Sequence, residues 1–307
     1  MTTITQTQSA PLPYATAPSA TKPPEANGLR RALRWLAYPS LLLANAGLMV
    51  WAAANELPFA AVAMPGLLAS LVALFVLERI QPHRRTWHPN RKEALRDLFY
   101  FGMNGGLDAL AKMGTAFAVA TLGSWHNGLG LWAALPLAIV IGDFAGYWLH
   151  RFGHRGWLWK VHGVHHTPDK VNTWNNNTVH FLNTLYSGLG KTLPLLLLGF
   201  SPEVIVLAAY VLTLQSFAVH ANVDVELGWL GYVVMAPAHH RLHHSTKLEE
   251  AGNFASAITL WDLAFGTFVY GRAREPMQVG VTDPTSFPSS NSVIQNQLHP
   301  FVDQSRG

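Results

Sequence analysis

The chain has 307 residues, of which 50% are hydrophobic and only 12% are charged, and its formal net charge is +4. Soluble domains carry about 25% charged residues, so this composition favours a membrane protein. Cysteine is absent, which excludes disulfide scaffolds, thiolate zinc sites and cysteine-bound iron–sulfur clusters. The basic residues lie beside apolar segments, so they indicate membrane topology and do not predict nucleic-acid binding.

The N-terminal part predicts a tail followed by a membrane hairpin. Residues 1–28 are rich in Thr, Ser, Pro and Ala without periodicity, which is typical of disorder. The uncharged runs 35–55 and 58–77 are each about long enough to cross a bilayer, and a short link joins them. Arginine and lysine residues flank the pair, so the positive-inside rule places both ends of the hairpin in the cytoplasm. The hairpin and its basic loop form a predicted N-terminal unit over 29–97.

Three further apolar segments follow. A weaker third span over 98–122 contains Asp108 and Lys112, spaced to pair across one helix turn. A fourth span covers 131–150. The apolar run 182–220 is broken near its middle and forms either two full spans or a shallow re-entrant hairpin, with both ends on one side. The sequence predicts an all-α, polytopic helical membrane protein with about four spans, a short apolar hairpin and a cytoplasmic helical cap.

Histidine is concentrated in the second half of the chain. Eleven of the 15 histidines lie between residues 150 and 244, all in segments that the topology places at the cytoplasmic side. Three motifs have histidines three or four residues apart, which puts them on one helix face where they can chelate a metal. Eight ligands exceed what one metal takes, so two metals are expected. The motif histidines are His150, His154, His162, His165, His166, His240, His243 and His244, with His180 and His220 to complete the set.

The choice of metal follows from the ligands and their place. Imidazole suits zinc, copper, iron and nickel. Structural zinc is saturated by four ligands and fits two imidazole-rich centres poorly, and a transporter would hold its ligands near the bilayer midplane. Iron for dioxygen chemistry is favoured, because a nitrogen-rich shell with open positions binds and reduces dioxygen. A non-redox membrane metal transporter or metal sensor is the alternative.

The motifs resemble the fatty acid hydroxylase/sterol desaturase superfamily of integral-membrane di-iron oxygenases over roughly residues 95–270. The three histidine boxes match as D-x-x-x-Y-W-x-H-R-x-x-H at 143–154, W-x-x-H-x-x-H-H at 159–166 and P-x-x-H-R-x-H-H at 237–244. Further matches are H-x-N at 220–222, the isolated His180, and N-F with W-D-x-x-F-G-T between 253 and 267. The chain departs from the family at Thr178 and Phe181 beside His180, and in the A-G-N-F-A segment at 251–255.

The resemblance implies two iron ions, with dioxygen as co-substrate. The expected reaction removes hydrogen from an unactivated carbon of a membrane lipid (fatty acyl, sterol-like or related), by hydroxylation or desaturation. The electron donor is expected to be a separate protein, a ferredoxin or a cytochrome b5-like protein with a reductase, because the chain shows no dinucleotide-binding motif and no haem domain. The hydroxylase-like catalytic domain covers 98–272, and a mobile C-terminal tail covers 273–307.

Three polar residues are candidate catalytic groups beside the metal ligands. Asp143 and Asp262 are candidates for orienting histidine ring N–H groups, or alternatively for buried pairs with Arg151 or Arg241. Asn222 is expected either to hydrogen-bond an iron-bound water or to cap a helix.

Overall fold

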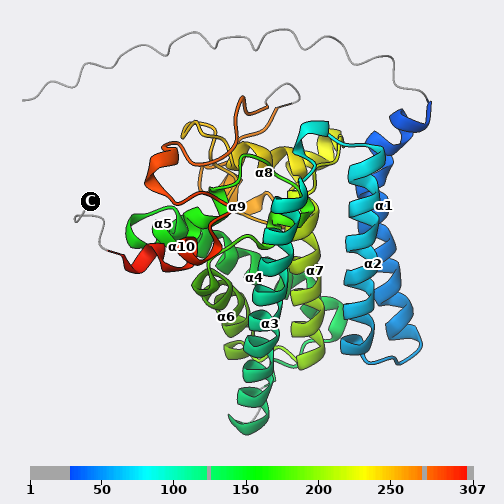
Figure 1. The fold of residues 1–307 in the computed structure, drawn as a ribbon. Helices are drawn as coiled ribbons and strands as arrows, with labels where there is room; N and C mark the ends of the chain where they lie inside the picture. Colours follow the sequence, from blue (N-terminus) through cyan, green and yellow to red (C-terminus); the bar gives the residue numbers. More distant parts are fainter. Residues whose placement is uncertain (1–27, 123–125, 272–274, 303–307) are drawn as a thin grey trace, which may run out of the picture.

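The structure, a computed structural model, describes residues 28–122, 126–271 and 275–302. Within them, long helices form a bundle, and short helices form a cap over one end of it (Figure 1). The bundle helices are α1 (Gly28–Ala54), α2 (Phe59–Ile80), α3 (Arg91–Leu122), α4 (Leu131–Gly153), α6 (Phe181–Leu197) and α7 (Pro202–His220). The cap helices are α5 (Gly156–His162), α8 (Pro237–His243), α9 (Leu260–Ala264) and α10 (Val293–Leu298), joined by 3₁₀ turns. The predicted all-α fold is confirmed, while residues 1–27 of the predicted tail lie outside the described residues.

Four of the described helices are long and apolar enough to cross a bilayer: α1, α2, α4 and α7. The number of candidate spans agrees with the prediction, but one predicted span is not among these four helices. The predicted third span, 98–122, lies within α3, which has 32 residues but is less apolar than these four. Its Asp108 and Lys112 form the expected ion pair, with 2.6 Å between carboxylate oxygen and ammonium nitrogen. The ambiguous segment 182–220 forms α6 and α7, of which α7 qualifies as a span.

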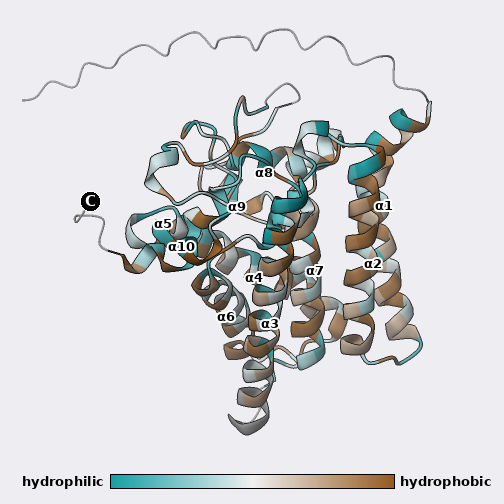
Figure 2. Ribbon diagram, in the orientation of Figure 1, coloured by the Kyte–Doolittle hydropathy of each residue, from teal (hydrophilic) through white to brown (hydrophobic). Residues whose placement is uncertain are grey.

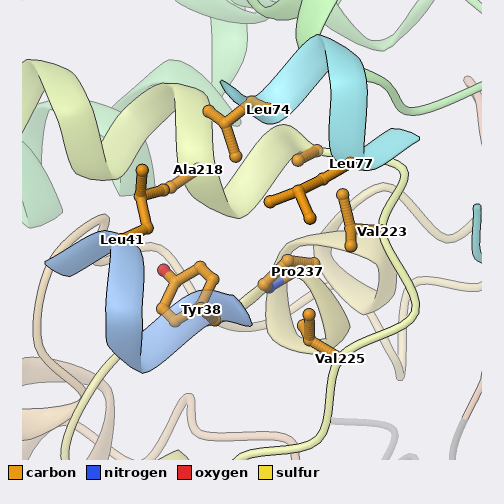
Figure 3. A pocket seen from close by; sticks show the side chains of 9 residues that line it. Tyr38, Leu41, Leu74, Leu77, Ala218, Val223, Val225 and Pro237 are labelled. Carbon is orange, nitrogen blue, oxygen red and sulfur yellow. The ribbon is translucent and has the colours of Figure 1, made fainter. Parts of the chain in front are cut away.

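Helix α7 is the centre of the bundle, packed against α2 on one side and α4 on the other. Figure 2 shows apolar residues along the bundle helices and more polar ones in the cap. Where α1, α2 and α7 meet below α8, a small apolar cavity of about 10 Å³ is lined by Tyr38, Leu74, Ala218 and Pro237, among others (Figure 3). This volume holds about one water-sized molecule, so the helices pack closely there.

Polar side chains also join three of the bundle helices. Asn45 of α1 accepts hydrogen bonds through its Oδ1 from Ser70 of α2, at 3.0 Å, and from the Tyr210 hydroxyl of α7. Gly66 allows this approach, because a Cβ at that position would lie 2.9 Å from the Tyr210 hydroxyl. Small residues and interhelical hydrogen bonds of this kind stabilise helix association where the surrounding lipid gives no hydrophobic driving force.

The C-terminal segment is folded, so the prediction of a mobile tail is wrong for residues 275–302. Phe287 is buried and packs against Gly163 in the second histidine box, where a Cβ would lie 2.2 Å from its ring. The Trp157 indole N–H donates to the Pro300 carbonyl at 3.0 Å. The composition of the segment is polar, but a few side chains with distant partners fix it against the cap.

Replacing Asn45 by leucine is expected to lower the free energy of unfolding by about 1 kcal/mol, because the Tyr210 and Ser70 hydroxyls lose their common acceptor. The measurement is unfolding in mixed detergent micelles. Asn55→Leu is the matched control. The Asn55 side chain donates to the carbonyl of the residue four positions earlier but lies exposed at the end of α1. An equal loss in both variants would contradict the role of the interhelical contact.

Candidate metal centre

Nine histidines gather into two groups at the end of the bundle covered by the cap. In each group, one ring nitrogen per histidine lies within 4.8 Å of those of all the others. Group one contains His150, His154, His162, His166 and His243, and group two contains His165, His220, His240 and His244. The structure therefore brings together nine of the ten histidines expected as ligands, in two sets as the ligand count suggested.

The second and third boxes each contribute to both groups. His162 and His166 point into group one, with 3.2 Å between their Nε2 atoms, while His165 points into group two. The third box is arranged in the same way. His240 and His244 share group two, with 3.0 Å between their Nε2 atoms, and the Nε2 of His243 lies 3.2 Å from that of His154 in group one.

The expectation that the second and third boxes each present all their histidines on one face is corrected by this division, whereas both histidines of the first box lie in group one. Residues i and i+4 differ by about 40° around a helix axis, whereas i+3 lies about 60° away in the other direction. The middle histidine of the second and third boxes is thus turned toward the other group. The groups are adjacent, because the stacked rings of His166 and His244 have centroids only 4.3 Å apart.

Main-chain and side-chain oxygens fix the outer nitrogens of four rings. The Nδ1 atoms of His150, His243 and His220 donate to carbonyl oxygens at 2.7, 2.8 and 2.8 Å. These carbonyls belong to Phe254, Gly252 and Asn172, and the Nδ1 of His162 lies 3.0 Å from the Asn183 side-chain oxygen. A proton held on Nδ1 leaves the Nε2 lone pair free to bind a metal.

The rings themselves fit a metal with nitrogen ligands. The Nε2 atom of His220 is buried with no hydrogen-bond partner, although buried polar atoms nearly always have one. Burial lowers the pKa of His162 to about 4 and that of His243 to about 3. Burial, together with the neighbouring histidines, also lowers the pKa values of His165, His166, His240 and His244. Neutral imidazole is the form that binds metal, and an all-imidazole set suits iron, copper, zinc or nickel better than magnesium or calcium.

Asp143 and Asp262 act on the backbone and contact neither the histidines nor the arginines. Asp143 accepts from the N–H groups of residues 256–258 at 2.9 to 3.2 Å. Asp262 accepts from the N–H groups of Phe254 and Ala255 at 2.8 and 2.9 Å. Both expected roles are thereby corrected, since each carboxylate holds the loop before α9.

The proposed arginine partners of these carboxylates are engaged elsewhere. Arg151 donates to the Tyr147 hydroxyl at 2.8 Å, and Arg241 forms an ion pair with Glu275 at 3.0 Å. Asn222 also differs from its expected roles: its amide donates to the Arg84 carbonyl at 2.9 Å and accepts from the Arg84 N–H at 3.0 Å. It therefore ties the end of α7 to the link between α2 and α3.

One peptide group connects a carboxylate to a histidine in each group. In group one, Asp262 accepts from the Ala255 N–H, and the carbonyl of the same peptide, from Phe254, accepts from His150. We call this arrangement a carboxylate–peptide–histidine chain. It makes the Phe254 carbonyl a better acceptor, because hydrogen bonds in series polarise one another.

Group two has the same arrangement, built on a residue that sequence reasoning missed. Glu78 accepts from the Thr173 N–H at 2.7 Å, and the carbonyl of that peptide, from Asn172, accepts from His220. Glu78 also accepts from the Asn222 N–H at 2.8 Å. The available signal was a glutamate directly after an uncharged apolar run, because a buried acid at the end of a span usually has a specific partner.

His180 lies outside both groups. Its Nε2 is 2.8 Å from the Gln297 carbonyl, and its Nδ1 accepts from the Leu182 N–H at 3.1 Å, which caps α6. Both ring nitrogens are therefore occupied, and we leave His180 out of the ligand set that we propose. His239 also belongs to neither group and stacks on Tyr270, with ring centroids 4.4 Å apart.

Replacing Asp262 by asparagine is expected to weaken metal binding at group one about 10-fold, because an amide N–H₂ facing the loop N–H groups disturbs the peptide that holds His150. The measurement is titration of the purified protein against an iron chelator. Asp283→Asn is the control, because Asp283 also accepts from a backbone N–H, that of Thr285, but is exposed. Identical titration curves for the two variants would refute the role given to Asp262.

Comparison with known proteins agrees with this geometry. Residues 135–267, which contain all nine grouped histidines, match the fatty acid hydroxylase family. The chain is 30% identical over 227 residues to an ornithine lipid hydroxylase of Rhizobium tropici, covering 69% of this chain and 68% of that protein. It is 31% identical over 149 residues to alkylglycerol monooxygenase of Homo sapiens, covering 46% of this chain and 32% of that protein.

A third relative is methylsterol monooxygenase 1 of Rattus norvegicus, 36% identical over 135 residues, with 42% of this chain and 44% of that protein covered. The chain thus spans less than half the length of the two monooxygenases. No solved structure matches it. The match to the ornithine lipid hydroxylase extends over two thirds of both proteins, and the chain belongs to the fatty acid hydroxylase/sterol desaturase superfamily.

Proposed function

We propose that this protein is a membrane-embedded, dioxygen-dependent oxidoreductase that hydroxylates or desaturates an unactivated C–H position of a membrane lipid. The observation that carries the proposal is the pair of adjacent groups of imidazoles, seven of the nine buried, at one end of a bundle of apolar helices. The relatives named as a lipid hydroxylase and as alkylglycerol and methylsterol monooxygenases support the same chemistry.

Each group would hold one iron ion, and iron supplies the capacity to bind and reduce dioxygen. Group one offers five nitrogen ligands and group two offers four. Six-coordinate iron would therefore keep about one position open in group one and about two in group two. The protein itself fixes the Nδ1 protons through the carbonyls of Phe254, Gly252 and Asn172.

Phe254 closes group one from one side. Its ring stands nearly edge-on to the rings of His150, His154 and His243, with centroid separations of 5.6, 5.2 and 5.5 Å. An apolar ring at this distance contributes no ligand and excludes water. Its own position follows from Asp262, which accepts from the Phe254 N–H at 2.8 Å.

The proposed catalytic unit is 98–272, with its site facing the cytoplasm. Exposed basic residues begin α3 at the same end of the bundle as the cap, which suits the positive-inside rule (Figure 1). Electrons would come from a separate ferredoxin or cytochrome b5-like protein with its reductase. An acidic donor of this kind would be attracted to the exposed Arg85, Arg91 and Lys92.

The decisive experiment compares the lipids of cells that carry the wild-type protein with those of cells that carry His165→Ala or His243→Ala, under ¹⁸O₂. We expect the wild type to produce a lipid shifted by one labelled oxygen or by the loss of two hydrogens. The purified wild type is expected to contain about two iron ions per chain. Each variant removes a ligand from one group and should lose both the product and bound iron.

His126→Ala serves as the control for this experiment, because His126 is exposed and belongs to neither group. Activity that survives complete removal of iron would refute the proposal. Metal flux in intact cells without oxygen consumption would instead support the alternative of a metal transporter or sensor.

A further inference from the structure

The short helix α10 buries a polar side chain and exposes two apolar ones, although Val293 packs inward and Gln295 is exposed. Asn296 is fully buried and donates to the carbonyls of Ser289 and Ser292 at 2.8 and 3.1 Å. Ile294 and Leu298, one helix turn apart, face outward and are 74% and 53% exposed. A helix on a water-exposed surface buries its apolar face and presents its polar one, so the medium around α10 is not simply water.

The exposed face continues into neighbouring residues. Phe301 and Val302, just after α10, are 57% and 56% exposed, and Trp157 of α5 is 48% exposed. The rings of Trp157 and Phe301 have centroids 6.2 Å apart. We define these five residues as the apolar rim: Trp157, Ile294, Leu298, Phe301 and Val302. Contiguous exposed apolar patches on proteins mark surfaces that contact another apolar body.

The apolar rim adjoins the surface that the bundle presents to lipid. Gln297 of α10 accepts from the N–H of Phe181, the first residue of α6, at 2.9 Å. Farther along, α6 exposes Leu189, Leu193 and Leu197. Figures 1 and 2 show α10 beside the start of α6, where the cap meets the bundle, with apolar residues on both helices. The rim therefore lies beside the start of a helix whose exposed leucines begin at Leu189, about two turns farther along.

We propose that the apolar rim lies in the bilayer interface and binds the boundary between headgroups and acyl chains. Trp157 suits this position, because its indole N–H is bonded to the Pro300 carbonyl while much of its ring is exposed, and tryptophan is enriched at membrane interfaces. The exposed amide of Gln295 lies at the flank of the apolar face, where headgroups are within reach.

Lipid contact at the rim would stabilise the segment that supports the second histidine box. Phe287, in the same C-terminal segment, packs against Gly163 between the ligands of that box. The C-terminal segment then lies between the bilayer, which contacts α10 on its outer side, and the second histidine box on its inner side. This proposal concerns the membrane contact and is independent of the reaction proposed above.

The absence of cysteine in the chain makes single-cysteine labelling direct. Leu298→Cys is labelled with a fluorophore in the full-length protein, reconstituted in phosphatidylcholine vesicles. Leu248→Cys is the matched control, because Leu248 is 76% exposed in a turn beside Lys247, Glu249 and Glu250. We expect a nitroxide attached to the lipid to quench the label at 298 several-fold more than the label at 248, and aqueous iodide to show the reverse order.

Quenching of the 298 label by iodide to the same extent as the 248 label would overturn the proposal, because the rim would then lie in water. Protection of the 298 label from both quenchers would also overturn it, since a protein surface such as a second copy would then cover the rim. Ile294→Cys replaces Leu298→Cys if that variant does not fold, and the same outcomes apply to it.

Discussion

Nine imidazoles gathered in a largely buried space are most stable when both nitrogens of each ring have a partner. The structure meets this condition in part, because the Nδ1 atoms of His165 and His244 are buried with no hydrogen-bond partner. Oxygens of Asn172, Asn183, Gly252 and Phe254 fix the outer nitrogens of four rings, and the inner nitrogens converge within 4.8 Å of one another. These oxygens come from three separate places in the chain, at residues 172, 183 and 252–254. A metal bound by these groups would therefore couple to the folding of the cap, because a displaced loop removes an outer partner and leaves an inner nitrogen misdirected.

Buried carboxylates support this arrangement without contacting a histidine. Glu78 and Asp262 each accept from the N–H of a peptide whose carbonyl holds an imidazole, one in each group. A direct carboxylate–imidazole contact would place a negative charge next to each metal. With a peptide between them, the carboxylate still orients the ring while its charge stays farther from the ligands. Asp143 holds the same loop as Asp262, through residues 256–258, and so connects the loop to α4.

The sequence was sufficient to predict features that depend on local spacing. Helical spans follow from apolar runs, and eight of the nine grouped histidines follow from the three- and four-residue spacing of the boxes, with His220 expected to complete the set. The division of the second and third boxes between two groups was not predictable, because it depends on which neighbouring segments face a helix. The roles expected for Asp143, Asn222 and Asp262 were wrong for the same reason, because their hydrogen-bond partners are backbone groups of distant loops. The folded C-terminal segment depends on contacts across more than a hundred residues, such as Phe287 on Gly163 and the Trp157 bond to Pro300.

The two groups lie at the end of the bundle because the loops around them and a lipid chain require different surroundings. Irregular backbone such as the loops at 172 and at 252–258 cannot face hydrocarbon, because its polar groups would lack partners. A lipid chain, in contrast, stays in hydrocarbon. His150 in the last turn of α4 and His220 as the last residue of α7 put the rings where helical backbone gives way to loops. At that depth, Glu78, Asp143 and Asp262 can accept hydrogen bonds from the backbone N–H groups of the loops. The bundle below remains open to lipid. The end of the bundle is thus the level at which a polar, loop-built metal centre and an apolar chain can meet.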